Sequence, residues 1–207
     1  MFCLLLATTN QNKITEYRQL LKNSGFKLIT LSRKLNFEVP ETGKTYAQNA
    51  VIKAKAYGKK SQIATLADDT GLEIKALNGF PGIFSNRFAA GNFPRARQEI
   101  LTRLKGIPIK QRQARFICAL ALYLPATGKI TSFTGTVNGQ IALKENGRYG
   151  FGYDPIFIPN GYKLTFGQMP SRQKNRLSHR YQALTKLQPY LKSLLKSLPP
   201  RPFSTNL

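Results

Sequence analysis

Acidic side chains are scarce in this chain of 207 residues, which has nine Asp and Glu against 32 Lys and Arg and a formal net charge of +23. Such an excess of positive charge attracts polyanions, and nucleic acid is the first candidate partner. The bases are scattered, however, with no basic arm and no aromatic-interleaved motif of the kind found in RNA-binding modules. A surface rich in solvated lysine and arginine explains the same composition, so both interpretations stay open.

Histidine and cysteine are also rare. His179 is the single histidine, which excludes a two-histidine metal site and means that any Ser-His-Asp triad would have to use it. The two cysteines, Cys3 and Cys118, are too few for a Cys₄ zinc site. Both lie in apolar, strand-like runs, which predicts reduced core residues in a cytoplasmic protein.

Long apolar runs are missing as well. No run approaches the ~20 residues of a membrane span, so no membrane partner is expected. Residues 2–7 are apolar but short and have no basic region before them, which favours a buried strand over a signal peptide. The length allows one large domain or two joined lobes with a substantial core.

Apolar patterning predicts strands mixed with helices, an order that favours an α/β fold. Thr45 and Gln48 have the spacing of a capping box, and Pro189 is expected to break or restart the last helix. The Pro-rich end, residues 199–207, is predicted to be a loose tail. The expected strands are 2–8, 62–67, 72–77, 113–124 and 129–137, and the expected helices are 13–23, from 45 onward, 94–104 and from 178 onward.

The loop Thr8–Lys13 joins the first expected strand to the first expected helix. Unpaired backbone N–H groups, the helix dipole and the charge of Lys13 suit a triphosphate there. The Walker A pattern is absent, and an ordinary polar loop would have a similar sequence.

Asp68 and Asp69 stand side by side, just beyond the strand expected over 62–67. Open α/β sheets place their ligands at such strand ends. Adjacent carboxylates repel one another, and Mg²⁺, which prefers oxygen ligands, would offset that repulsion. Glu41 is a candidate third ligand from a loop. The alternative is that one aspartate caps a helix or a turn.

Two further segments combine aromatic, small and basic residues. Phe151 and Tyr153 alternate with glycine, which would let a nucleobase approach a ring, although a core-packed turn would look the same. Ser178 precedes His179 and Arg180 at an expected helix start. His179 and Arg180 are either hydrogen-bond donors to a ligand or exposed bases beside a capping serine.

Taken together, six motifs resemble, in order, those of the inosine/xanthosine triphosphate pyrophosphatases, over about residues 3 to 195. The motifs are Ala7-Thr8-Thr9-Asn10 with Lys13, Glu41-Thr42-Gly43 with Gln48-Asn49, Ala67-Asp68-Asp69-Thr70-Gly71, Asn78-Gly79 with Pro81-Gly82, Gly150-Phe151-Gly152-Tyr153-Asp154-Pro155, and Ser178-His179-Arg180.

The resemblance implies hydrolysis of dITP, ITP or XTP to the nucleoside monophosphate and pyrophosphate. It also implies one domain over residues 1–198, with a mixed central sheet flanked by helices and an active-site cleft between two lobes. A cytoplasmic homodimer that requires Mg²⁺ is expected on the same basis.

Carried over by position, the resemblance makes Asp69 the proton acceptor and a magnesium ligand, with Glu41 and Asp68 completing the metal site. Phe151 would stack on the base, while His179 and Arg180 would donate to the purine 6-oxo group. Adenine, whose 6-amino group is itself a donor, would leave those donors unpaired. The expected substrate-binding residues are Thr8, Thr9, Asn10, Gln11, Asn12, Lys13, Lys53, Thr70, Phe151, Gly152, Tyr153, Asp154, Lys174, His179 and Arg180.

The chain departs from the family pattern at several positions. Thr9 and Asn12 replace residues that are commonly glycine, and Gln48 and Gln168 stand where glutamate is usual. Loss of two carboxylates predicts a weakened acid network around the metal. Two rival functions stay open: a basic nucleic-acid-binding protein without catalysis, and a pyrophosphatase for other nucleotides, such as modified pyrimidines.

Overall fold

A computed structural model describes residues 2–35 and 37–197. The predicted tail, 199–207, lies outside the described residues. The strands form a mixed sheet in the order β2-β1-β3-β5-β6-β7, with the short β4 paired to β3. The strands are β1 (Phe2–Leu6), β2 (Phe26–Thr30), β3 (Thr65–Ile74), β4 (Pro81–Gly82), β5 (Gln113–Leu124), β6 (Lys129–Ile141) and β7 (Phe157–Pro159).

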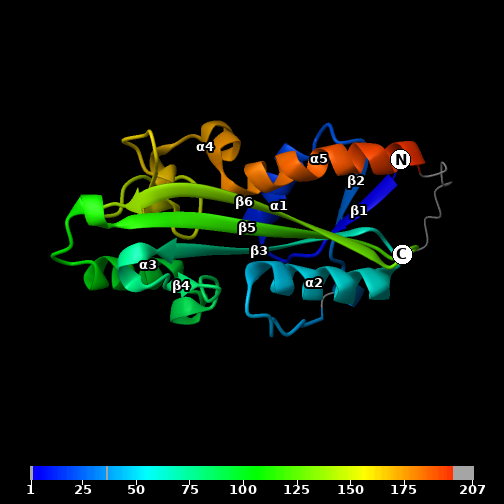
Figure 1. Cartoon of the computed structure of the whole chain (residues 1–207), viewed down its shortest axis with the longest axis horizontal. Helices are drawn as coiled ribbons and strands as arrows, with labels where there is room; N and C mark the ends of the chain where they lie inside the picture. The colour runs from blue at the N-terminus through cyan, green and yellow to red at the C-terminus, as the bar shows by residue number, and fades with distance from the viewer. Residues whose placement is uncertain (1, 36, 198–207) are drawn as a thin grey trace.

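Helices cover both faces of this sheet, with α4 and α5 on one side of β5 and β6 and α2 and α3 on the other (Figure 1). β1 is parallel to β2 and β3, whereas the remaining pairs are antiparallel. The predicted α/β class, with a mixed sheet flanked by helices, is therefore confirmed. The helices are α1 (Gln11–Leu20), α2 (Tyr46–Ser61), α3 (Phe93–Arg103), α4 (Ser171–Leu177) and α5 (His179–Ser197).

The core is divided by the sheet. Alternate residues of β3 and β5 point to opposite faces, so Leu66 and Leu120 pack with α1 and α5, while Ala67 and Ala121 pack with α2. A separate cluster around Phe116 lies at the other end of the long strands, with residues of α3 and β7. A cleft lies beside this cluster, and Leu72 of β3 and Phe116 of β5 are among the residues that line it.

Several sequence predictions are wrong in detail. The strand expected over 62–67 is β3, which continues through both aspartates to Ile74, and Lys75–Leu77 is a 3₁₀ turn. α5 runs through Pro189 without ending, because buried leucines on both sides hold it to the sheet. β2 and α4 were not predicted. The capping box of Thr45 and Gln48 is confirmed. In the described part of the chain, no helix combines the length and apolarity that a bilayer crossing needs.

Candidate active site

A cleft opens beside the carboxyl end of β1. It is lined by side chains of the β1–α1 loop, α2, β3, the glycine-rich loop before β7 (residues 147–154), α4 and the start of α5. β1 pairs with β3 only as far as Leu66, so the following residues of β3 have no neighbour on that side. Asp68 and Asp69 therefore lie within β3 but beyond the end of β1. The two aspartates are therefore near the carboxyl end of β1, and not at the end of β3.

Asp69 faces α2. Its Oδ2 accepts a hydrogen bond from Asn49 Nδ2 at 3.1 Å, and its Oδ1 lies 3.8 Å from Lys53 Nζ. Asn49 and Lys53 are one turn apart on α2, so one helix face carries both. Burial raises the pKa of Asp69 and outweighs the opposing effect of Lys53. The carboxylate is consequently a stronger base than an exposed aspartate.

Glu41 reaches the same group. Lys53 Nζ lies 2.6 Å from Glu41 Oε1, so this ammonium group stands between two carboxylates. Arg87, from the loop after β4, contacts Glu41 at 3.3 Å. Within the described ranges, no three His, Cys, Asp or Glu side chains converge as a ready metal site. Glu41 and Asp69 are the two carboxylates that the structure brings together, because both contact Lys53.

Asp68 faces the opposite side of β3, toward α1 and α5, because successive strand residues alternate. Its Oδ2 lies 3.0 Å from Lys13 Nζ and accepts a hydrogen bond from Thr70 Oγ1 at 3.0 Å. Burial alone would raise its pKa, but Lys13 and Arg180 together hold the pKa far below its usual range. The structure thus separates Asp68 from the group formed by Glu41, Lys53 and Asp69.

Close backbone approach fixes this part of β3. A Cβ atom at Gly71 would collide with the carbonyl oxygen of Gly82 and with the ring of Tyr46. Ser85 Oγ accepts from the Leu72 N–H at 2.9 Å and donates to Gly82 O at 2.6 Å. The loop that carries Arg87 is thereby held against the aspartate strand.

The β1–α1 loop leads directly into α1. Asn10 caps α1, since its Oδ1 accepts from the N–H groups of Asn12 and Lys13. The N–H groups of Thr9 and Gln11 have no partner within the described residues. Asn10 and Lys13 line the cleft, whereas Thr8, Thr9, Gln11 and Asn12 are not among its lining residues.

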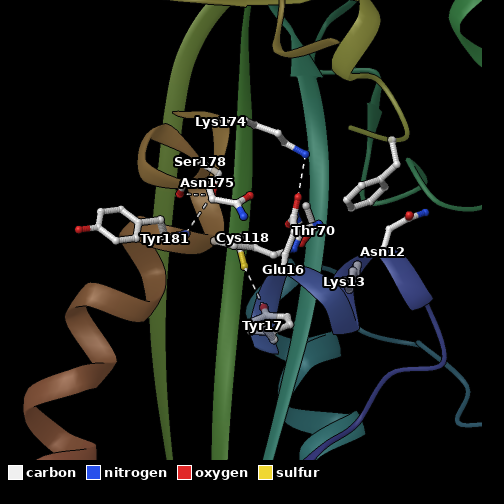
Figure 2. A network of polar contacts seen from close by, with 12 residues as sticks. Asn12, Lys13, Glu16, Tyr17, Thr70, Cys118, Lys174, Asn175, Ser178 and Tyr181 are labelled. Atoms are coloured by element: carbon white, nitrogen blue, oxygen red, sulfur yellow. Dashed lines mark hydrogen bonds and ion pairs between the residues drawn. The ribbon is translucent and has the colours of Figure 1, made fainter. Parts of the chain in front are cut away.

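A buried ionic network lies beneath the glycine-rich loop, and Figure 2 shows Glu16 and Lys174 at its centre. Glu16 accepts from Lys174 Nζ at 2.7 Å and from Arg180 at 2.6 Å. Lys174 also donates to Asp154 at 2.6 Å, and Asp154 accepts from the Phe151 N–H at 2.7 Å. The network joins α1, α4, α5 and the glycine-rich loop.

Sequence reasoning missed Glu16. The sequence pattern could have identified it, because Glu16 is the single acid on α1 and lies between the buried residues Ile14 and Tyr17. Burial alone would raise the pKa of Glu16, but Arg180 and Lys174 hold it below its usual value. Glu16 is therefore ionised and forms ion pairs with two cations beneath the cleft, Lys174 and Arg180.

The base-binding candidates meet at this end of the cleft. Lys174 Nζ lies 4.7 Å and Arg180 Cζ 5.2 Å from the centre of the Phe151 ring. His179 stacks on Phe116 at 4.8 Å, and neither of its ring nitrogens has a partner in the described part of the chain. Burial, together with Arg180 and Lys174, lowers the pKa of His179 well below its usual value, so the ring is neutral.

Other predicted contacts serve the fold. Tyr153 lines the cleft and is held there by donating to Ser85 O at 2.7 Å and by packing edge-on against Phe93. Ser178 caps α5, as one interpretation proposed, but His179 and Arg180 are buried rather than exposed. Gln48 accepts from the N–H groups of Lys44 and Thr45. Gln168 accepts from the Thr165 N–H in the same manner, so both glutamine side chains cap helix starts.

The mixed sheet and this cleft define an α/β protein with paired acidic and basic groups at one end and aromatic groups at the other. The chain belongs to the Ham1 family, whose model matches residues 4–190. It is 39% identical over 193 residues to the dITP/XTP pyrophosphatase of Bacillus subtilis, covering 91% of this chain and 96% of that protein. The dITP/XTP pyrophosphatase of Halalkalibacterium halodurans is 41% identical over 190 residues, with 90% and 97% covered.

Solved structures agree. The Ham1 protein of Staphylococcus aureus superposes with a TM-score of 0.82 at 35% identity, covering 93% of this chain and 99% of the other. A HAM1 protein from Coxiella burnetii gives a TM-score of 0.84 at 36% identity, with 93% and 100% covered.

Proposed function

We propose that this protein hydrolyses non-standard purine nucleoside triphosphates (dITP, ITP and XTP) to the nucleoside monophosphate and pyrophosphate, which clears them from the nucleotide pool. The observation that carries the proposal is the cleft itself. A buried carboxylate, Asp69, lies beside Lys53 at one end, and a neutral imidazole, His179, which has no partner among the described residues, lies at the other. The names of the relatives support the same activity.

In this mechanism Asp69 acts as the general base. It takes a proton from a water molecule whose oxygen attacks the α-phosphorus, and the bond from that phosphorus to the bridging oxygen of the β-phosphate breaks. Burial raises the pKa of Asp69, which makes its carboxylate a better proton acceptor than an exposed one. Asn49 orients the carboxylate through its hydrogen bond to Oδ2. Lys13 and Lys53 line the cleft and offset phosphate charge.

Mg²⁺ fits this end of the cleft. Glu41 and Asp69 already share the cationic ammonium of Lys53, and Mg²⁺ is typically bound by one or two carboxylates together with water and substrate phosphates. We propose Glu41 and Asp69 as its protein ligands and leave out Asp68, which faces the other side of β3. When bound, the ion would neutralise charge on the phosphate oxygens.

Base selection is proposed to rest on Phe151 and His179. His179 has unused hydrogen-bonding capacity and is available to donate to a purine 6-oxo group. Arg180, expected as a second donor, is held by Glu16 and lies 3.6 Å from Asp68. We therefore assign the contact with the 6-oxo group to His179. Exclusion of the guanine 2-amino group by a tight pocket stays a prediction; equal turnover of GTP and XTP would contradict it.

One experiment tests the proposal against both rivals. The protein is incubated with Mg²⁺ and, separately, dITP, XTP, dATP, dGTP or dUTP, and the monophosphate and pyrophosphate are measured. We expect turnover of dITP and XTP far above that of the other three. Turnover of dUTP alone would favour a pyrimidine pyrophosphatase. Absence of turnover in every reaction would defeat the proposal.

The resemblance further leads us to propose a cytoplasmic homodimer. Sedimentation equilibrium of the full chain tests the oligomeric state, and a monomeric mass at micromolar concentration would contradict it.

A further inference from the structure

One face of the molecule carries exposed bases and no exposed acid. α1, β2, α4 and α5 form this face, with α1 and α5 in one core cluster and α4 joined to α1 by a 2.7 Å hydrogen bond from Asn175 to Gln19. Figure 1 shows α4 and α5 following one another along it. Glu16 is the only acidic residue in these four elements, and it is buried.

Six exposed bases, here called the basic face, occupy three helices or their ends. They are Arg18, Lys22, Arg172, Arg176, Lys192 and Lys196. Within the described residues none of the six forms an ion pair. The positive charge of this face is therefore available to an external anion.

The spacing of these bases sets like charges beside one another, as it also does for the exposed Lys55 and Lys59 of α2. The six bases fall into three pairs four residues apart, of which Arg172/Arg176 and Lys192/Lys196 lie within one helix, where like charges at that spacing are destabilising. Arg172 also lies in the first turn of α4, where the helix dipole disfavours a cation. On α3, by contrast, Arg103 pairs with Glu99 at 2.9 Å. An anionic partner would offset the repulsion that the basic face leaves uncompensated.

We propose that the basic face binds the phosphate backbone of nucleic acid without reading its sequence. Phosphate contacts come mainly from arginine and lysine, supplemented by neutral donors such as glutamine. On α5 the exposed Gln182 and the half-buried Gln188 supply such donors along the same helix. This binding is separate from the cleft and does not depend on the proposed hydrolysis.

A lipid surface fits the same face less well. A helix that lies in a membrane interface needs an exposed apolar side. The apolar side chains of α5, including Leu184, Leu187 and Leu191, are buried in the core. Tyr181 is the one exposed large hydrophobic residue in the described parts of these four elements.

The test measures binding of the full chain to a labelled 20-mer single-stranded RNA and a 20-bp duplex DNA by fluorescence anisotropy at several salt concentrations. The variant combines Arg172→Gln, Arg176→Gln, Lys192→Gln and Lys196→Gln. We expect the unaltered protein to bind with a logarithmic salt dependence. The variant should lose about three to four from the magnitude of that slope and at least about tenfold in affinity at low salt.

A matched control removes the same number of exposed positive charges elsewhere: Lys59→Gln, Lys60→Gln, Lys105→Gln and Lys110→Gln, at the end of α2 and after α3. This control should bind nearly as tightly as the unaltered protein. Equal weakening by both variants, absence of binding, or tighter binding to phosphatidylserine vesicles than to either nucleic acid would each overturn the proposal. The kcat for dITP should be unchanged in both variants, so a failure here is distinguishable from failure of the proposed hydrolysis.

Discussion

At the scale of single residues, the two adjacent aspartates have different environments and therefore different expected roles. Asp69 has a pKa raised by burial, so its charge is unfavourable in the folded state, whereas Asp68 has a pKa lowered by two neighbouring cations. We predict that Asp69→Asn lowers kcat by on the order of 10²-fold or more. Its thermal stability should be unchanged or higher, because the substitution removes a buried charge.

Asp68→Asn is the matched comparison. It would leave Lys13 and Arg180 without their buried carboxylate, and breaking such a pair costs about 3–5 kcal/mol. Steady-state kinetics and thermal unfolding of both variants check the contrast. An Asp69→Asn variant that keeps its activity would remove that residue from the mechanism.

Glu16 gives a prediction that depends on pH. Its folded pKa lies below its usual value, so its contribution to stability is fully present above the unfolded pKa of about 4.3 and is lost as the pH falls through the folded pKa. Glu16→Gln should therefore lower the free energy of unfolding by about 3–5 kcal/mol at pH 7. The difference from the unaltered protein should shrink below about pH 4.3.

Urea unfolding at neutral and acidic pH measures this difference. Glu99→Gln is the control, because Glu99 makes only an exposed pair with Arg103, which is worth about 0–1 kcal/mol. A stability difference for Glu16→Gln that does not change with pH would contradict the prediction.

At the scale of elements, the sequence predicts best where one pattern controls the structure. β5 is an apolar run with turn residues after it, and its predicted bounds, 113–124, are those observed. The start of α2 follows from the capping box at Thr45. The apolar pattern did not predict the full length of β3, because two charged residues, Asp68 and Asp69, interrupt the apolar run. The cations that neutralise them lie in α1, α2 and α5, far away in sequence.

Tertiary packing accounts for the other failures at this scale. Proline in a helix interior costs about 3 kcal/mol, yet α5 continues through Pro189 because Leu187 and Leu191 are anchored in the core. Local sequence contains no information about that anchoring. The same limit explains why Glu16 was not identified, because its partners Lys174 and Arg180 lie more than 150 residues further along the chain.

The start of α2 carries a prediction of its own. Gln48, which stands where the family usually has glutamate, accepts two backbone N–H groups at the helix N-terminus. Gln48→Glu would keep these bonds and add a negative charge where the helix dipole favours it. We expect it to raise the free energy of unfolding by about 0.3–1 kcal/mol. Activity and Mg²⁺ requirement should stay within about twofold, since this position is a cap.

Gln48→Ala is the control and should cost about 1 kcal/mol through loss of the cap. Kinetics across a Mg²⁺ titration, together with thermal unfolding, measure both variants. A large gain in kcat or in Mg²⁺ affinity for Gln48→Glu would mean that the position belongs to the acid network after all.

At the scale of the whole molecule, the acids are concentrated at the cleft. Five of the nine (Glu16, Glu41, Asp68, Asp69 and Asp154) lie in or beneath it. They face five cations: Lys13, Lys53, Arg87, Lys174 and Arg180. Because these charges cancel, the formal net charge of +23 belongs to the rest of the chain. Long-range attraction of an anionic substrate therefore arises outside the cleft.

This distribution predicts how salt acts on catalysis. Raising the ionic strength from about 20 to about 300 mM shortens the range of surface electrostatics severalfold. We expect kcat/KM for dITP to fall by on the order of tenfold over that range, while kcat changes little, because steering acts on encounter and not on the bound complex. The two fourfold glutamine variants described above should both reduce the salt dependence by similar amounts, since each removes four charges from outside the cleft. If kcat/KM is independent of salt, or if kcat falls in parallel with it, the cations within the cleft govern capture and the surrounding charge has no part in it.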